Sequence, residues 1–149
     1  MNSKSTVLFT SLQDYFKDQT KIQKLIDIRD HIYGITPRFL DWFVVHYSRK
    51  HPIYVNGYHI YELYKNAIKS YGKDHFDPFC RKHKVVIQIF NDALIQTSIS
   101  QLNFIRWAID TKIIDFIEHN LQMFITEMLL FQQQQQQKQP KVKKRKQHQ

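Results

Sequence analysis

Apolar residues recur at helical spacing over most of this chain, and an alternating pattern appears only briefly near the middle. A period of 3.6 residues indicates amphipathic helices, whereas a period of two indicates strands. Residues 5–18 place Leu12 and Phe16 on one helical face, and residues 22–31 favour a second helix. The first of these segments is short, so we expect residues 1–18 to be only loosely attached to the domain.

The third helical segment carries signals at both of its ends. Thr36 is a suitable N-cap, and Pro37 suits the first helical position, where a missing N–H is not needed. Basic residues just before Pro52 would lie near the negative end of the helix dipole, and the proline ends the helix. The apolar stripe predicted to face inward comprises Leu40, Phe43, Val44 and Tyr47.

A hairpin is predicted directly after this helix. Residues 53–55 and 58–61 have strand-like composition, and they flank Asn56-Gly57. A type I′ turn needs positive φ at both central residues, which this pair tolerates. The sequence therefore predicts two short strands joined by a two-residue turn.

A second pair of strands is expected further along the chain. Residues 85–90 are apolar except for Gln88 and rich in β-branched side chains, which favours a largely buried strand. Asn91-Asp92 is a turn signal, and residues 93–96 can return as a paired strand. We expect these strands and the earlier hairpin to form one small antiparallel sheet of three or four strands.

The helix between these strands has a separate basic stripe. Its apolar residues lie within residues 64–71, while Lys65, Lys69 and Lys73 follow one another at four-residue steps. Side chains at this spacing share one helical face, so the three ammonium groups are predicted to face solvent together. Gly72 is a suitable C-terminal cap, and the helix should end close to it.

A pair of helices is predicted at the C-terminal end of the domain. Ser98 with Gln101 forms a capping-box pattern, which places a helix start at the serine. A break near residues 111–112 separates this helix from a second one over residues 113–131. A helix-turn-helix that reads DNA is disfavoured, because the turn lacks glycine and the second helix is too apolar. Together these elements predict a single α+β domain over residues 1–131.

Residues 132–149 have a different composition. Six glutamines open a low-complexity segment with six basic side chains and no acidic one, so we expect a disordered basic tail. Its basic run resembles a short nuclear import signal, with nonspecific polyanion contact and a passive solubilising role as alternatives. The cations of this run are Lys141, Lys143, Lys144, Arg145 and Lys146.

The charge of the chain points to a polyanionic partner. The formal net charge is +9, and residues 46–84 contain eight Lys or Arg against three acidic residues. Tyrosines lie between these cations, and rings beside cations suit both phosphates and stacked bases. The alternative is that the cations form an ordinary solvated face. The predicted DNA or RNA contacts are Lys65, Lys69, Lys73, Arg81, Lys82 and Lys84.

No signature of catalysis or metal binding accompanies this basic segment. His75, Cys80 and His83 are close in sequence, but a structural zinc site normally needs four ligands and usually more than one cysteine. A cysteine nucleophile would also need an oriented base and an oxyanion site. Phosphate-loop, dinucleotide and zinc-protease motifs are absent from the sequence. We therefore expect no enzyme, no cofactor and no metal.

Three segments of the chain carry a family resemblance: residues 38–50, 64–82 and 98–121. They resemble, in order and spacing, a family of small uncharacterised proteins from nucleocytoplasmic large DNA viruses, mimivirus-like or phycodnavirus-like. The most specific piece is the string FDPFCR at residues 76–81. The family pattern continues with a second arginine and an acidic residue, whereas this chain has Lys82 and His83. The resemblance implies origin and fold, since the family has no established activity.

These observations together predict a noncatalytic viral accessory protein that contacts nucleic acid. The alternative is a protein interaction module or a structural component of the virion or viral factory. The expected partners are DNA or RNA, viral proteins and a nuclear import receptor. A single cysteine, no signal peptide and no long apolar run favour a reducing intracellular compartment without membrane insertion. This would be the host nucleus or a cytoplasmic viral factory, with packaging in the virion as an alternative.

Overall fold

The computed structural model describes residues 1–138, and these form two compact units. The first unit is Met1–Phe116, and it contains every strand that the structure describes. The second unit begins at Ile117 with the end of α7 (Ile113–His119) and continues into α8 (Leu121–Lys138). The predicted domain boundary at residue 131 therefore falls inside a helix of the second unit.

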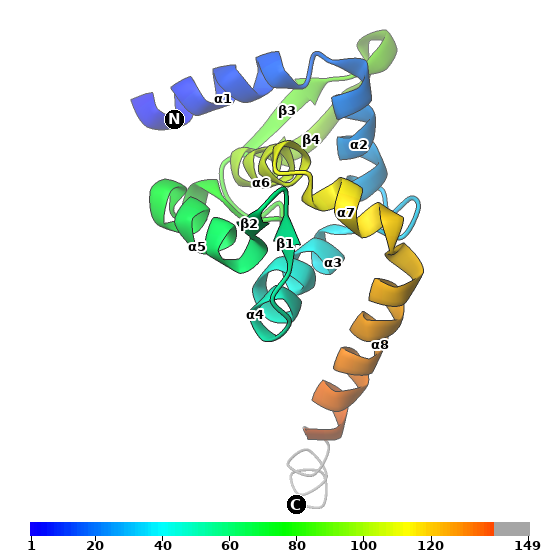
Figure 1. Ribbon diagram of the computed structural model, residues 1–149. Coiled ribbons are helices and arrows are strands. Elements are labelled where there is room, and N and C mark those ends of the chain that lie inside the picture. Colours follow the sequence, from blue (N-terminus) through cyan, green and yellow to red (C-terminus); the bar gives the residue numbers. More distant parts are fainter. Residues whose placement is uncertain (139–149) are drawn as a thin grey trace, which may run out of the picture. The chain divides into compact units, whose positions relative to one another are not determined.

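The first unit is built around α6 (Ile99–Asp110), which lies at its centre in Figure 1. Eight of its twelve residues are buried, including polar Gln101 and Asn103. It contacts α1 (Ser3–Tyr15), α2 (Gln19–Arg29) and the sheet strand that precedes it. Burial on nearly all sides explains why the buried residues of α6 are not confined to one stripe.

The first helix, α1, packs against α6 over its second half. Leu12 is fully buried, and Nη1 of Arg106 donates a 2.9 Å hydrogen bond to Oγ of Ser11. The hydroxyl of Tyr15 donates a 2.7 Å hydrogen bond to Asp110. The sequence predicted a loosely attached segment here, whereas the structure gives α1 both apolar and polar contacts with α6.

The third helical segment is one continuous helix with a π-helical middle. It runs from α3 (Pro37–Asp41) through η1 (Trp42–Tyr47) to α4 (Ser48–Lys50). Thr36 accepts a 3.0 Å hydrogen bond from the backbone N–H of Phe39, so the predicted N-cap is confirmed. The wider turn was not predicted, because apolar spacing does not distinguish a short π segment from an α-helix.

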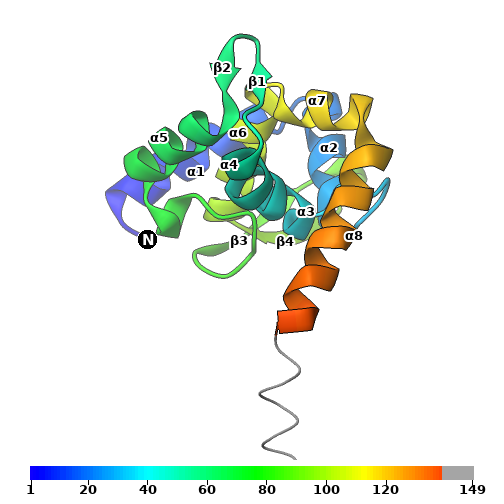
Figure 2. The same cartoon turned by 60° about the horizontal axis from the view of Figure 1, so that its bottom comes forward.

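The first predicted hairpin is present. β1 (Tyr54–Val55) pairs with β2 (Tyr58–His59), and Asn56 and Gly57 have φ angles of 52° and 82°. These are the positive φ angles that a type I′ turn requires. Figure 2 shows this hairpin projecting beyond the helices that surround its base.

The second hairpin is also present, but the single sheet is wrong. β3 (Lys84–Gln88) pairs with β4 (Leu94–Ser98), and the turn between them contains Asn91 and Asp92, both at positive φ. These two strands form a sheet separate from the first hairpin. β1 and β2 have two residues each, which is too short to extend a ladder to a third strand. β3 alternates between buried and exposed residues, because only one of its faces is covered.

Aromatic packing fills the space between α5 (Ile60–Tyr71) and α6. Gly72 ends α5 at φ 77°, and η2 (Lys73–His75) then leads to Phe76. The ring of Phe76 is 1% exposed and lies 4.8 Å from the ring of Phe104, centroid to centroid. The segment after α5 is therefore fixed to the core before β3 begins.

The C-terminal helices differ from prediction in two respects. The break after α6 lies at Thr111 and Lys112, as predicted, but a second break at Asn120 divides the expected helix into α7 and α8. α8 also continues through the glutamines to Lys138, so the predicted disorder is wrong for residues 132–138. Glutamine has good helix propensity, and adding residues to an existing helix avoids the nucleation cost. Residues 139–149 lie outside the described part.

Candidate nucleic-acid interface

In the described part of the chain, one lysine of the basic stripe of α5 forms an ion pair, and the other two do not. Nζ of Lys65 is 3.7 Å from Oε1 of Glu62 and 5.5 Å from the centroid of the Tyr61 ring. Lys69 and Lys73 are exposed, and neither has a carboxylate oxygen within 4.0 Å among the residues described. Because α5 ends two residues before Lys73, the predicted stripe holds only its first two members on the helix itself.

Arg81 forms an ion pair with Asp77, which lies four residues earlier in the same turn. Its Nε and Nη2 each donate a 3.2 Å hydrogen bond to Asp77, whose side chain is 18% exposed. The guanidinium also lies over the ring of Phe79, 4.8 Å from the centroid. The backbone N–H of Asp77 donates to the carbonyl of Ser100, which ties this ion pair to α6. Arg81 therefore stabilises the turn and has less charge available for a ligand.

Lys82 is paired as well. Its Nζ donates a 2.8 Å hydrogen bond to Oδ1 of Asp74, and this bond lowers the pKa of that carboxyl group. Both side chains are largely exposed, so the pair contributes little to stability. The carboxylate of Asp74 nevertheless lies beside Lys82, a predicted nucleic-acid contact. Three of the predicted cations, Lys65, Arg81 and Lys82, are thus matched with carboxylates.

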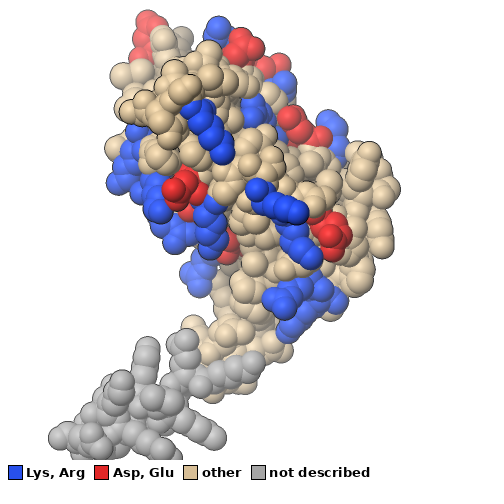
Figure 3. Space-filling model, turned by 90° about the vertical axis from the view of Figure 1, so that its left-hand side faces the viewer, with Lys and Arg blue, Asp and Glu red and all other residues tan. Residues whose placement is uncertain are grey.

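Asp41 adds a further carboxylate near the same cations. Burial raises its pKa above the ordinary range, while the charges of His46, Arg81 and Lys73 act in the opposite direction. Burial, with Asp41 as the largest nearby charge, also raises the pKa of Tyr64. The region between α3 and the turn after α5 therefore mixes both signs of charge, and it is not uniformly basic. Figure 3 shows the same interspersion on one face of the molecule.

Lys84 lies in the wall of a different depression. This cavity has a volume of about 420 Å³, and the lysines of α5 are not among its lining residues. Nε of Arg29 donates a 3.1 Å hydrogen bond to the carbonyl of Gln96 there, and its Nη1 donates to Asp30. Sequence reasoning missed Arg29, because the contact joins positions 67 residues apart. The charged and thiol groups that line the cavity are Arg29, Asp30, His31, Cys80 and Lys84.

His75 and His83, two of the three residues considered above as zinc ligands, stack on each other. The rings of His75 and His83 are 4.9 Å apart, and Nε2 of His75 forms a 2.8 Å hydrogen bond with Oγ of Ser5. Burial lowers the pKa of His75, with smaller contributions from the charges of His83 and Lys4. Within residues 1–138, no group of three or more His, Cys, Asp or Glu side chains is arranged to hold a metal ion.

Few of the interleaved tyrosines are available for stacking on a base. Tyr54 and Tyr58, on the projecting hairpin, are each 63% exposed. The ring of Tyr71 instead stacks on Phe76, 5.9 Å between centroids, and contributes to the core. The half-buried tyrosines of the basic segment are Tyr47, Tyr61, Tyr64 and Tyr71.

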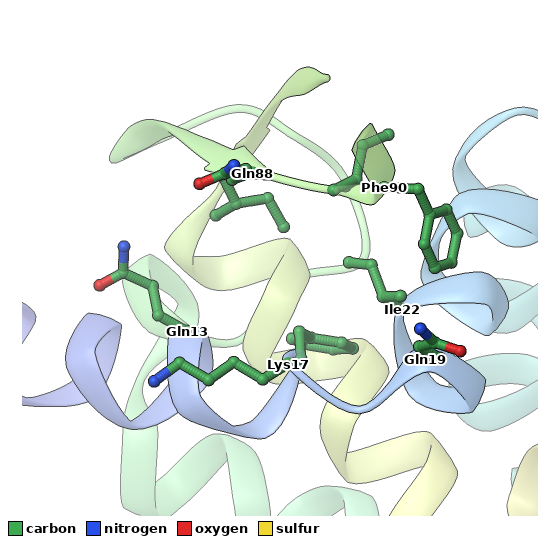
Figure 4. Close-up of a pocket in the computed structure, with 9 residues that line it drawn as sticks. Gln13, Lys17, Gln19, Ile22, Gln88 and Phe90 are labelled. Atoms are coloured by element: carbon green, nitrogen blue, oxygen red, sulfur yellow. The ribbon is translucent and has the colours of Figure 1, made fainter. Parts of the chain in front are cut away.

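A second cavity of about 400 Å³ lies between the α1–α2 connection and the tip of the β3–β4 hairpin. Figure 4 shows Gln13 and Lys17 on one side, Gln88 and Phe90 across from them, and Ile22 pointing into the space between. Sequence reasoning missed this site, although an aromatic residue directly before a hairpin turn is a readable signal. Its lining combines apolar side chains with neutral amides and one lysine, a composition common in ligand sites.

The predicted import-like cations, Lys141, Lys143, Lys144, Arg145 and Lys146, lie outside the described residues. Among the described helices, none has both the length and the apolar character required to cross a membrane.

Comparisons with known proteins find relatives of the chain. A family model described as "Family of unknown function (DUF7197)" matches residues 2–149. An uncharacterized protein of Acanthamoeba polyphaga mimivirus, L507, is 39% identical over 108 residues, which cover 63% of this chain and 41% of that protein. No solved structure matches. The expected membership in an uncharacterised viral family is confirmed at that level, while FDPFCR as its motif stays a prediction.

Proposed function

Since the chain belongs to DUF7197, a family of unknown function, we propose a role from its own surface: it is a noncatalytic protein that binds nucleic acid. The observation that carries this proposal is that Lys69, Lys73 and Lys84 are exposed without a carboxylate within 4.0 Å among the described residues. Unpaired ammonium groups can neutralise phosphates without first giving up a protein partner. A chain with net charge +9 also attracts polyanions at long range.

The ion pairs narrow the predicted contact set. Lys65, Arg81 and Lys82 would have to exchange a carboxylate for a phosphate, which reduces the gain from each contact. Lys69 and Lys73 would make no such exchange with an ion-pair partner. We therefore place the folded domain's phosphate contacts on the unpaired lysines, with the basic tail as a second, independent source of charge.

A charge-matched pair of double variants tests this assignment. Lys69→Gln with Lys73→Gln should reduce the salt dependence of nucleic-acid binding by roughly 0.9 in log–log slope for each duplex phosphate that is no longer neutralised. Lys65→Gln with Lys82→Gln removes the same charge from paired positions and should change the slope less. The measurement is fluorescence anisotropy with a labelled duplex at several salt concentrations, using chains that end at residue 138. Equal slopes for the two double variants would contradict the proposal.

A protein interaction module is the second candidate, and the projecting hairpin favours it. Tyr54 and Tyr58 are well exposed on its two strands, and exposed tyrosines are enriched at protein interfaces. Under this alternative the protein would be a component of a virion or viral factory. Replacing both tyrosines with serine should then abolish capture of a viral partner while nucleic-acid binding is unchanged. Loss of nucleic-acid binding in that variant would instead assign the hairpin to the nucleic-acid surface.

A further inference from the structure

A third cavity, of about 380 Å³, adjoins the one drawn in Figure 4 and is shallower. Both cavities are lined by Gln19 and Phe90, so the two hollows meet at these side chains. Phe90 is 37% exposed and is held at the start of the turn between β3 and β4. An aromatic ring that lines two hollows offers flat groups in either hollow a surface for stacking.

Four of the eight polar side chains that line the two hollows are neutral amides, and the other four are Lys17, Thr20, Lys24 and Asp27. Gln13 and Gln88 reach the first, Gln23 reaches the second, and Gln19 is shared. The Nε2 atom of Gln23 donates a 2.9 Å hydrogen bond to Asp27, so this amide is oriented and keeps its oxygen as an acceptor. Amides combine donors and acceptors, which suits the edges of nucleobases better than it suits phosphates.

Each hollow has one lysine in its lining, and the second hollow also has the carboxylate of Asp27. Lys17 lines the first and Lys24 lines the second. The carboxylate nearest to Lys17 is Asp14 at 3.7 Å, and both side chains are about 80% exposed, so this pair is weak. Stacking faces, base-reading amides and flanking cations form the combination that proteins use for single-stranded nucleic acids.

We propose that Phe90 and the two hollows beside it bind consecutive unpaired bases of a single-stranded nucleic acid. This inference rests on the proposed nucleic-acid function and names its substrate class. One base in each hollow would stack against the Phe90 ring, with the glutamine amides at the base edges. Bases in a duplex are already stacked and paired, so they cannot enter the hollows.

The test compares variants of one hairpin on single-stranded and duplex oligonucleotides. Phe90→Ala should weaken single-strand binding by about five- to 100-fold, since removing one base–aromatic stack has effects of this size. Phe90→Trp should retain binding. Leu94→Ala is the matched control, because Leu94 is 66% exposed on the same hairpin and lines neither hollow. Circular dichroism of each variant checks that the domain is folded.

The outcomes separate this inference from the function on which it rests. A selective loss of single-strand affinity in Phe90→Ala, rescued by tryptophan, supports it. Single-strand affinity equal in Phe90→Ala and Leu94→Ala overturns it, and the proposed function survives if the lysine variants still lower the salt slope. Competition by a mononucleotide as strong as that by an oligonucleotide also overturns it, because the site would then accept a free nucleotide. Failure of the folded domain to bind any nucleic acid overturns this inference and the assignment of phosphate contacts to the folded domain, and it leaves nucleic-acid binding to the tail.

Discussion

Phe76, the first residue of the FDPFCR string, is a core residue. Its ring lies 5.2 Å from that of Trp107 and contacts three further aromatic rings. Pro78 is buried, and its carbonyl accepts a 2.9 Å hydrogen bond from Gln101. Asp77 accepts two hydrogen bonds from Arg81. These contacts assign the string to anchoring the connection between α5 and β3 on α6.

Replacing Phe76 with alanine should therefore destabilise the fold strongly. A buried Phe→Ala change removes apolar contact and leaves a cavity, with a typical decrease of about 3–5 kcal/mol in unfolding free energy. The measurement is urea unfolding monitored by circular dichroism. Phe79→Ala, at a half-buried ring of the same string, is the control and should cost less. A decrease below about 1 kcal/mol for Phe76→Ala would refute the anchoring role.

His75 should make stability depend on pH. Its pKa in the folded state is lowered from 6.5, mainly by burial, so the unfolded chain binds a proton that the folded chain resists. Stability is therefore highest above about pH 6.5 and falls as the pH drops towards the lower folded-state pKa. The melting temperature should decrease from about pH 7.5 to about pH 5.5, and this decrease should be smaller in His75→Gln.

At the scale of the element, α8 shows how a low-complexity sequence can take regular structure. Its last seven residues are glutamines and one lysine, which have no apolar stripe of their own. They continue a helix that the preceding apolar residues have already started. Low complexity predicts the absence of packing, but it does not exclude continuation of a neighbouring helix.

A proline substitution tests this continuation. Gln134→Pro removes a backbone donor and clashes with the preceding turn, at a cost of about 3 kcal/mol inside a helix. We expect the far-ultraviolet circular dichroism signal of helix to decrease by the amount expected for about one or two helical turns. Gln134→Ala should leave the signal unchanged or increase it. An unchanged signal in the proline variant would mean that the glutamines are not helical in solution.

At the scale of the whole molecule, the positive charge is unevenly distributed. Five of the cations lie in residues 139–149, so removing this segment lowers the net charge from +9 to +4. The remaining domain carries several of its cations beside carboxylates. Long-range attraction to a polyanion is therefore expected to come mostly from the tail, while positioning comes from the folded surface.

Deleting residues 139–149 should weaken nucleic-acid binding without abolishing it. The salt dependence should become less steep by up to about 0.9 for each duplex phosphate that the tail neutralises, since fewer counterions are released. Binding isotherms at several salt concentrations measure this slope. A matched chain with the five cations replaced by glutamine keeps the length and controls for it. Complete absence of binding in both chains would confine the activity to the tail and leave the folded domain to protein partners.

The local signals in the sequence were sufficient for the elements that depend on near neighbours. The caps at Thr36 and Ser98 and the turn at Asn56-Gly57 are confirmed, because each depends on residues within three positions. Tertiary structure decided how those elements combine. It separated the strands into two hairpins and placed Arg29 against Gln96, a contact between distant segments.

The candidate site also combines features that the local sequence predicts with features that only folding determines. Spacing predicted which cations are exposed, but not that Lys82 would reach Asp74 across a turn or that Phe90 would line two hollows. Exposure follows from local hydrophobic pattern, which the sequence contains. The electrostatic partner of a side chain and the shape of a cavity depend on segments that only folding brings together. The tertiary structure alone therefore determined both.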